Sequence, residues 1–583
     1  MPWTTEPHRR AFWLDCATGP VAAWLHLPAD GHPRRAGVVI CGPIGHEHTH
    51  SYRTLLHLAD HLAGEGFAAL RFDYHGTGIS PGDALTPRLL ERWIENVCAG
   101  ARVMRKITGG EVSLLGLRLG AALAGVAASQ LAIDHLVAWA PVVSGKGFAR
   151  ELDAMAKIAG ATRSDDADYL EAGGFILSDE TAEQLSTIDL AQLECQIRGD
   201  ALILERDDIP TSPRLSSGLS GRGVHVDVLE GPGYGAMMDE PHYTVVPDAA
   251  ISTITQWLSA RTPADAGGSI ALPHFETSGP SYDFGREDLV QLEEPTRLFC
   301  VHTVPAETVA PEVPLLVLSN SGAVHQVGPN RVYVELSRSL ARAGVPSLRL
   351  DLRNLGDSIR PGREEENHPY PGTAVEDLGL AIDWAQRKHG YRRIVIGGIC
   401  SGAYNAFRAA LEIDDPALVG VLIINPLTFN WYEGLSLALP PAFQTISDAK
   451  YYEGAMRDPT KWRRVLRGDT DLRYAASFVL RHTAETARRV LGDVLEGLRL
   501  RAPERLAKEL LRLQASGRHA DFVFSTSDPG HGILNAQAGR TLRKLSKAGA
   551  VSLSFIEQAD HTFSRRDWRK ELATVVTARM QAY

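Results

Sequence analysis

Cysteine is scarce in this sequence, and long apolar runs are absent. The 583 residues include six cysteines, none of them in a Cys-x-x-Cys pair, so neither a metal cluster nor a disulfide framework is expected. No uninterrupted run of about 18 apolar residues occurs, so we expect no membrane span. The first 13 residues also lack the apolar core of a signal peptide. We therefore expect a cytoplasmic protein that needs neither a metal nor another cofactor.

Positive charge is also in short supply. Lys and Arg number 60 against 70 Asp and Glu, which gives a net charge of −10. Nucleic acid is therefore not expected as a partner. With 44% hydrophobic and 22% charged residues, the composition is that of a globular protein. The length suggests two large domains or several small ones.

The sequence does contain apolar β-branched runs that alternate with helical patterns. In the first half, a predicted hairpin (11–15 and 21–27) precedes apolar runs at 37–40, 68–72, 112–115, 135–139, 201–204 and 224–229. The second half repeats this order at 298–304, 314–318, 347–350, 393–396, 419–424, 521–524 and 551–556. Such alternation predicts an α/β fold, in which helices cover both faces of a parallel sheet.

Two landmarks indicate that the halves are duplicates. The run Leu-Arg-Phe-Asp at 70–73 matches Leu-Arg-Leu-Asp at 348–351, and the turn at 116–120 matches the turn at 398–402. The two spacings, 278 and 282 positions, are nearly equal. We therefore predict two domains, at 1–262 and 286–583. The segment between them is rich in Gly, Pro, Ser and Ala, as linkers are.

Each half also contains a long insertion after its fifth core strand. The first runs from about 142 to 198, and the second from about 427 to 520. The second is helical by pattern, and we predict that it forms a lid. Its segment Lys461–Arg518 holds 14 basic and 7 acidic residues. This segment is either a solvated helical face or a docking patch for an acidic partner, such as an acyl carrier protein or the phosphates of coenzyme A.

The segment 395–403 has the pattern of a strand, a tight turn and a helix centred on Cys400. Gly398 and Gly402 lie two residues to either side, which is the spacing of a nucleophile elbow. We predict that Cys400 is a nucleophile and that the backbone N–H of Ser401 faces an oxyanion. A second oxyanion donor is predicted at Ser321 or Gly322, after the strand at 314–318. The alternative is a buried thiol that packs as a small hydrophobe.

An acid and a base follow Cys400 in the order that a catalytic triad requires. Asp528 lies on a sharp loop after the strand at 521–524, and His561 lies one loop beyond the last strand. Asp528 would orient His561, which in turn would hold the thiolate as an ion pair. Arg331, in a loop of the same half, is a candidate for an anion site.

The first half lacks this constellation. Its elbow centre is Arg118, and a guanidinium cannot attack a carbonyl. Asp208 aligns with Asp528, but Tyr234 stands opposite His561. We expect Arg118 either to form a structural ion pair, with Asp208 as the candidate partner, or to bind an anion. The first half is therefore predicted to be a pseudo-hydrolase.

These motifs resemble those of α/β-hydrolases. The resemblance rests on the elbow, on Leu-Arg-Phe-Asp-Tyr-His-Gly-Thr-Gly at 70–78, and on Leu-Arg-Leu-Asp-Leu-Arg-Asn-Leu-Gly-Asp-Ser at 348–358. The first half is similar to the serine aminopeptidase-like branch and to hydrolases associated with exosortase gene systems. Dienelactone hydrolase shows that the fold can work with a cysteine. The resemblance implies two tandem α/β-hydrolase domains, each a mostly parallel sheet flanked by helices, with helical lid insertions.

The predicted function is acyl transfer through a Cys400 acyl-thioester intermediate. The chain would act as an acyltransferase, or as a thioesterase or ester hydrolase, on a small acyl thioester or ester. The alternative is a non-catalytic scaffold or binding protein built from two pseudo-hydrolase domains. An acid and a histidine at the expected places in one half favour the enzyme.

Overall fold

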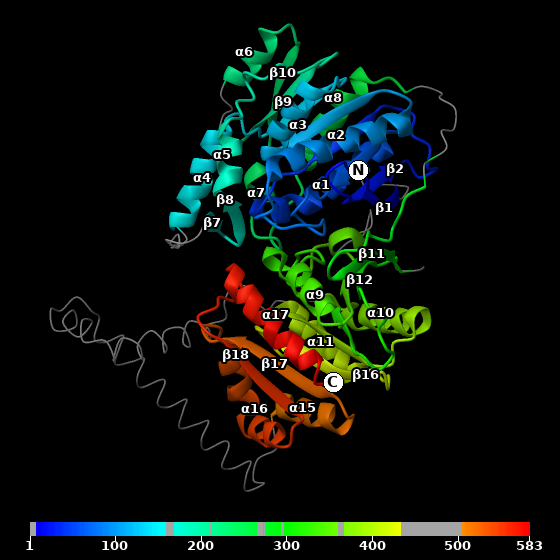
Figure 1. The fold of residues 1–583 in the computed structure, drawn as a ribbon, viewed down its shortest axis with the longest axis vertical. Coiled ribbons are helices and arrows are strands. Elements are labelled where there is room, and N and C mark those ends of the chain that lie inside the picture. The colour runs from blue at the N-terminus through cyan, green and yellow to red at the C-terminus, as the bar shows by residue number, and fades with distance from the viewer. Residues whose placement is uncertain are drawn as a thin grey trace, which may run out of the picture. The chain divides into compact units, whose positions relative to one another are not determined.

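The computed structural model describes residues 7–158, 168–209, 213–264, 272, 274–292, 297–359, 366–432 and 504–583. Their strands form two eight-stranded sheets and one two-stranded sheet (Figure 1). By internal contacts the chain divides into two compact units. Unit 1 comprises residues 1–310, 322–369 and 563–577, and unit 2 comprises residues 311–321, 370–562 and 578–583.

The first sheet has the strand order β1-β2-β4-β3-β5-β6-β9-β10. Its strands are β1 (His8–Leu14), β2 (Val21–Leu27), β3 (Gly37–Cys41), β4 (Ala68–Phe72), β5 (Val112–Leu117), β6 (Leu136–Trp139), β9 (Ala201–Arg206) and β10 (Val226–Gly231). β1 pairs with β2, and β2 with β4, in antiparallel fashion, and the other neighbours are parallel. The predicted hairpin and the six apolar runs after it are all present as strands.

Helices cover both faces of this sheet. Helices α1 (His46–Gly64) and α8 (Asp248–Arg261) pack on the face that Val38 presents. Helices α2 (Leu89–Thr108) and α3 (Leu119–Gln130) pack on the face that Val39 presents. Consecutive side chains of a strand point to opposite faces, so the continuous apolar run of β3 is buried on both. The remaining elements are α4 (Gly145–Ile158), β7 (Tyr169–Ala172), β8 (Phe175–Ser178), α5 (Asp179–Ser186), α6 (Arg214–Ser220) and α7 (Tyr234–Met237).

The second sheet repeats this pattern in the order β11-β12-β14-β13-β15-β16-β17-β18. Its strands are β11 (Gly285–Gln291), β12 (Phe299–Pro305), β13 (Leu315–Leu318), β14 (Ser347–Leu350), β15 (Ile394–Ile399), β16 (Leu418–Ile424), β17 (His519–Ser525) and β18 (Val551–Ile556). The pairs β11–β12 and β12–β14 are antiparallel, and β13, β15, β16, β17 and β18 are parallel in turn. The predicted fold class, two mostly parallel sheets flanked by helices, is thus confirmed.

The described residues of the second half form the helical elements η1 (Pro329–Arg331), α9 (Val332–Arg342), η2 (Gly356–Ser358), α10 (Ala374–His389), α11 (Ser401–Glu412), α15 (Arg505–Ala515), α16 (Gly530–Lys547) and α17 (Arg566–Met580). Helix α11 packs on β15 and β16, and α15 packs beside α16. Most of the predicted lid, residues 433–503, lies outside the described residues. Among the helices described, none is long and apolar enough to cross a bilayer. The proposed domain boundary at 262–286 stays a prediction.

A buried polar pair joins β2 to α1 in unit 1. His26 is fully buried, and its Nδ1 lies 2.7 Å from Oδ1 of Asp60. Its Nε2 accepts a hydrogen bond from Nε of Arg71. Burial, and to a smaller extent the charges of Arg71 and Arg9, lower the pKa of His26 to about 4 against the pull of Asp60. The ring is therefore neutral in the folded protein at neutral pH.

We expect this pair to make unit 1 acid-sensitive. A histidine in the unfolded chain has a pKa near 6.5. Between pH 6.5 and about 4, the unfolded chain therefore binds a proton at His26 that the folded protein does not bind. The free energy of unfolding should therefore fall as the pH falls, by about 2 kcal/mol between pH 7 and pH 5. Urea unfolding of the wild type and of His26→Gln at both pH values measures the difference. An equal pH dependence in the two proteins would contradict it.

Candidate active site

Cys400 lies at the apex of the turn between β15 and α11. Its backbone adopts φ 60° and ψ −116°, a conformation that costs a residue with a side chain of the order of 1–3 kcal/mol. Glycines on both sides make the turn possible. A Cβ added to Gly398 would lie 2.8 Å from Cα of Gly402, and one added to Gly402 would lie 2.5 Å from the carbonyl oxygen of Asn320. The predicted strand, elbow and helix are therefore present, and the thiol is partly exposed.

Asp528 and His561 come together as their order in the sequence predicts. Asp528 follows β17 and is buried, and its Oδ2 lies 2.5 Å from Nδ1 of His561. Its other oxygen accepts the backbone N–H of Gly530 at 2.8 Å. Both carboxylate oxygens are thus held, and the imidazole is fixed with its Nε2 facing away from Asp528.

The electrostatics of His561 connect it to Cys400. Burial alone would lower its pKa, but Cys400 and Asp528 outweigh burial and raise the pKa to about 10. The Nε2 atom is buried and has no hydrogen-bond partner of regular geometry among the described residues. This nitrogen is therefore available to exchange a proton with the thiol or with a leaving group.

The histidine loop is held by a residue that sequence analysis missed. Asn425 directly follows β16, adopts a left-handed φ of 44° and is fully buried. Its amide donates to the carbonyl oxygen of His561 at 2.9 Å and to Oγ of Ser525 at 2.8 Å. Ser525 in turn donates to the carbonyl oxygen of Asp560. The only sequence signal for this network is an Asn-Pro pair directly after an apolar strand.

The predicted oxyanion donors lie on two segments. Ser401 is the first residue of α11 and is fully buried. The loop that carries Ser321 follows β13, and its Asn320 oxygen lies against Gly402, so this loop reaches the elbow. Gly322, the alternative donor, adopts a left-handed φ of 59°. The oxyanion role of all three stays a prediction.

Three aromatic rings next to the elbow were not anticipated. Tyr370 stacks on Trp431 with a centroid distance of 4.2 Å, and it meets Tyr404 edge-on at 5.3 Å. Tyr404 lies one helical turn after Cys400, to whose carbonyl its N–H donates. Burial raises the pKa of Tyr370, and the negative charge of Cys400 raises it further. Tyr370 therefore stays protonated beside the thiol and offers a neutral O–H donor.

The elbow of the first half keeps the geometry but not the nucleophile. Arg118 adopts φ 54° and ψ −120°, close to the values of Cys400. Its Nε donates to Glu47 at 2.5 Å, and its Nη2 donates to both oxygens of Glu151 at 2.8 and 2.9 Å. Arg118 and Glu47 are almost fully buried. An ion-paired guanidinium thus occupies the place of the thiol.

We expected Arg118 to form a structural ion pair, but Asp208 was the wrong partner. Asp208 pairs instead with Arg206, two residues earlier at the end of β9, at 2.7 Å. Arg206 also lies 4.1 Å above the ring of Tyr234. Glu47 takes the place next to Arg118 because the first turn of α1 brings it to the elbow. Aligning the two halves of the sequence does not predict this ion pair, because Glu47 lies 71 positions from Arg118.

Replacing Arg118 with methionine should destabilise unit 1 without touching the chemistry of Cys400. Glu47 would remain buried without its cation, a loss that costs about 3 kcal/mol when one partner of a buried pair is removed. The free energy of urea unfolding should fall by about this amount, while turnover per folded molecule should not change. The double variant Arg118→Met/Glu47→Gln should recover part of the stability. Additive losses in the double variant would contradict the pairing.

The guanidinium of Arg331 binds backbone oxygens of the chain itself rather than facing an anion site. Its three guanidinium nitrogens donate to the backbone oxygens of Gly78, Ser80 and Gly82. Burial lowers its pKa to about 9. The expected anion site is therefore replaced by a structural role, in which Arg331 ties down the loop at 78–82. Because the acceptors lie about 250 positions earlier in the chain, the loop around Arg331 gives no hint of them.

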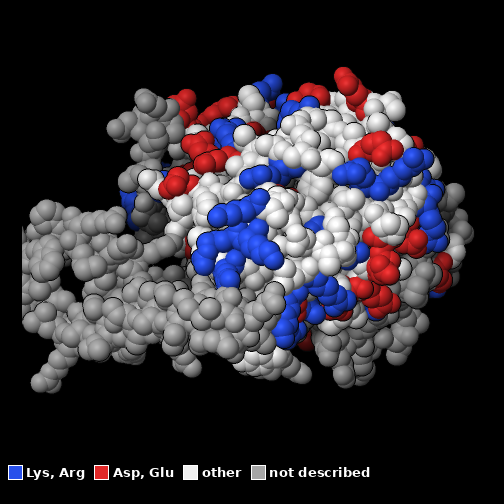
Figure 2. Space-filling view, turned by 90° about the horizontal axis from the view of Figure 1, so that it is seen from below, with Lys and Arg blue, Asp and Glu red and all other residues white. Residues whose placement is uncertain are grey.

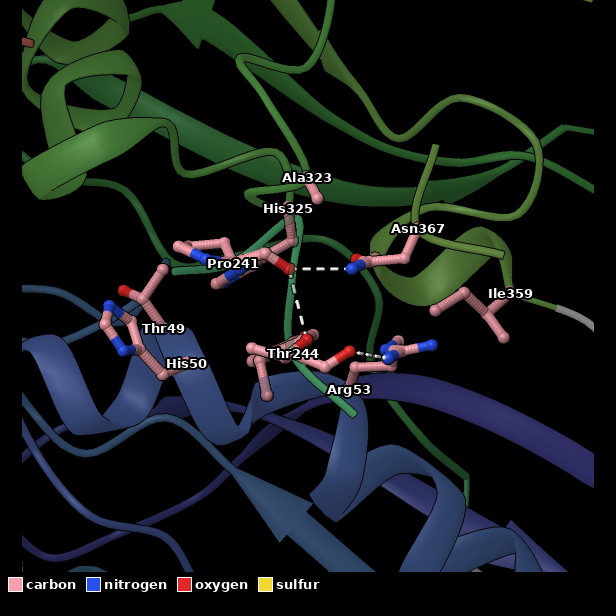
Figure 3. A pocket seen from close by; sticks show the side chains of 11 residues that line it. Thr49, His50, Arg53, Pro241, Thr244, Ala323, His325, Ile359 and Asn367 are labelled. Carbon is pink, nitrogen blue, oxygen red and sulfur yellow. Dashed lines mark hydrogen bonds between the residues drawn. The ribbon is translucent and has the colours of Figure 1, made fainter. Parts of the chain in front are cut away.

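A polar pocket in unit 1 contains none of the predicted site residues. Figure 3 shows it between α1 and the segments that carry Pro241 and Asn367. Asn367 donates to the carbonyl oxygen of Pro241 at 2.7 Å, and Arg53 donates to that of Thr244. The described residues include no group of three His, Cys, Asp or Glu side chains that could hold a metal ion. Of the basic segment Lys461–Arg518, only the part from residue 504 onwards lies within the described residues.

Residues 317–575 match the model of the alpha/beta hydrolase family. The matched segment contains Cys400, Asp528 and His561, together with the loop after β13. A search of curated proteins finds no match.

Similar solved structures are esterases and hydrolases. Est1E from Butyrivibrio proteoclasticus, with bound ferulic acid, is 19% identical with a TM-score of 0.36, over 43% of this chain and 99% of that chain. Dienelactone hydrolase from Anabaena variabilis is 12% identical with a TM-score of 0.31, over 51% and 97%. An esterase from Pyrococcus furiosus is 16% identical with a TM-score of 0.32, over 44% and 91%. These values are too low to carry an argument about activity.

Proposed function

We propose that this chain is an acyl-transfer enzyme that works through an acyl-thioester on Cys400. The observation that carries the proposal is the position of His561. Its ring is hydrogen-bonded to Asp528 through Nδ1, and its pKa is raised to about 10 by Cys400 and Asp528 against the effect of burial. A histidine that interacts with both an elbow cysteine and a buried carboxylate has the arrangement of a catalytic triad. The match of residues 317–575 to the alpha/beta hydrolase family supports it.

The chemistry follows from this arrangement. The thiolate of Cys400 attacks the acyl carbon of a thioester or ester, and the carbonyl π bond opens to an oxyanion near the N-terminus of α11. When the oxyanion collapses, the bond to the leaving thiol or alcohol breaks, and His561 donates its Nε2 proton to that group. Water, an alcohol or an amine then loses a proton to His561 and attacks the acyl-thioester. This addition forms a second oxyanion, and its collapse breaks the bond between the acyl carbon and Sγ of Cys400, which releases the product and restores the thiolate–imidazolium pair.

Transfer is favoured over hydrolysis for thioester donors. Exchange of an acyl group between two thiols replaces one thioester by another, so the acyl-enzyme forms at little change in free energy. Tyr370, Tyr404 and Trp431 place an apolar surface beside the thiol, and such a surface displaces water. We therefore propose acyltransferase activity in the first place, with thioesterase activity, or esterase activity on activated esters, as the alternative.

The test is direct capture of the acyl-enzyme. The full chain is mixed with butyryl-pantetheine, and intact mass spectrometry should find one butyryl group per chain. Peptide mapping should place it on Cys400. The same experiment on Cys400→Ala should show no adduct. An adduct on Ser401 or elsewhere in wild type, or no adduct in a preparation that turns over, would overturn the proposal.

Thiol labelling should separate Cys400 from the other cysteines. Burial raises the pKa of Cys16 to about 12 and that of Cys98 and Cys195 to about 11, and it also raises that of Cys41. These four thiols hold almost no thiolate at neutral pH, whereas Cys400 is partly exposed and faces an imidazolium. Brief treatment with iodoacetamide at pH 7 should alkylate Cys400 at least about tenfold faster. Equal labelling of all sites would favour the non-catalytic scaffold.

A further inference from the structure

The exposed face of α15 and α16 is basic. The two helices lie side by side in unit 2, and they expose seven cationic side chains: Arg505, Lys508, Arg512, Arg540, Arg543, Lys544 and Lys547. The sequence of α16 contains no Asp or Glu, and α15 contains only Glu509. On the side of the molecule seen from below, where these helices lie, Figure 2 shows blue side chains gathered together. We call this surface the α15–α16 face.

Local helix chemistry explains only part of this charge. Glu509 accepts from Arg505 at 3.0 Å and from Arg408 at 2.8 Å, so it is shared between two cations. Cations in the last turn of a helix interact favourably with its dipole, which accounts for Arg512, Lys544 and Lys547. Lys508, Arg540 and Arg543 are exposed and lie before the last turn of their helices, so the helix dipole does not account for them. A basic face of this kind on a chain of net charge −10 sets up a directional field for an anionic partner.

Both helices start beside the Cys400 site. The first residue of α16 is Gly530, whose N–H donates to Asp528. Arg505 begins α15 and donates to Asn430 at 2.6 Å, next to Trp431 of the aromatic rings. With a rise of 1.5 Å per residue, Arg540 to Lys547 lie up to about 15–25 Å along α16 from Gly530, and the interruption of the helix at Ala538 shortens this distance. A partner on this face can therefore reach the thiol only through a flexible arm of about that length.

We propose that the α15–α16 face docks an acidic protein that carries the acyl donor as a thioester on a long flexible arm. This inference rests on the proposed acyl transfer by Cys400. The reaction is thioester exchange: the thiolate attacks the arm-bound acyl carbon, and the arm thiol leaves with a proton from His561. Nucleic acid fits less well, because neither helix contains a Trp, Tyr or Phe on which bases would stack, and the chain as a whole is acidic.

Binding is tested on the full-length Cys400→Ala chain, which keeps the face but cannot turn over. The probe is an acyl carrier protein with a butyryl group on its phosphopantetheine arm. Arg543→Glu/Lys544→Glu should weaken binding at least about tenfold, since two attractions become repulsions. The matched control is Arg387→Glu/Lys388→Glu, which reverses two exposed charges in the last turn of α10. Binding by the unaltered face should also weaken steeply with salt, because the Debye length is about 8 Å at physiological ionic strength.

Turnover separates this inference from the function on which it rests. In chains with Cys400 intact, Arg543→Glu/Lys544→Glu should lower kcat/KM at least about tenfold with the carrier-bound butyryl group. It should leave kcat/KM for free butyryl-pantetheine unchanged, as the control pair should for both substrates. Equal binding and turnover in the two variants, or stronger competition from a single-stranded DNA oligonucleotide than from the carrier, would overturn the docking face. Failure of wild type to acylate with free butyryl-pantetheine would overturn the function itself, and the binding result would stand separately.

Discussion

Replacing Cys400 with alanine should lower kcat/KM by at least about a thousandfold and leave the fold intact. Loss of a triad nucleophile removes the covalent route altogether, and the rate that remains comes from binding and oxyanion stabilisation alone. A thousandfold loss corresponds to about 4 kcal/mol of transition-state stabilisation. The change removes only a partly exposed sulfur atom, so stability should change by less than about 1 kcal/mol. Initial rates with butyryl-pantetheine, together with urea unfolding, measure both quantities.

The first-half elbow provides the matched control for this experiment. Arg118 has almost the backbone angles of Cys400, but its side chain is ion-paired to Glu47 and Glu151. Arg118→Met should therefore keep kcat per folded molecule. If Cys400→Ala retained activity and Arg118→Met lost it, the roles assigned to the two elbows would be reversed. If both retained activity, the chemistry would lie outside the two elbows.

Local patterns predicted the elements that place the site. Apolar β-branched runs indicated the core strands, and small residues spaced two apart around Cys400 indicated the strained turn, because both signals are local in sequence. The hydrogen bond between Asp528 and His561 followed from the order of the elements, since parallel strands bring their carboxyl ends to one edge. Strand β11 was missed because its sequence carries charges. Glu287 of β11 is fully buried between Arg338 and Arg349. The alternation of apolar and polar residues that marks a strand does not reveal a buried ion pair of this kind.

The partners of the site residues were beyond local patterns. Tyr370 interacts with Cys400, and Asn425 donates to His561. Whole helices and strands separate the partners in the sequence, so only the tertiary fold brings them together. The acceptors of Arg331 lie in a loop of the other sequence half, so the predicted anion site was replaced by a structural contact. Such contacts depend on which side chains the tertiary fold brings together. A single sequence carries no record of that.

Replacing His561 with alanine should change both the rate and its pH dependence. In wild type, Cys400 and Asp528 raise the pKa of His561 to about 10 against burial, so the imidazolium is present through neutral pH and is lost only as the pH rises through about 10. Without it, kcat/KM should fall about 10²–10⁴-fold, the usual contribution of a general acid–base. In wild type, kcat/KM should fall as the pH rises through about 10, and the residual rate of His561→Ala should not show that fall. Alkylation of Cys400 by iodoacetamide at pH 7 should be at least about tenfold slower in His561→Ala, because the imidazolium beside the thiol is gone. Equal alkylation rates in the two proteins would show that His561 does not act on the thiol.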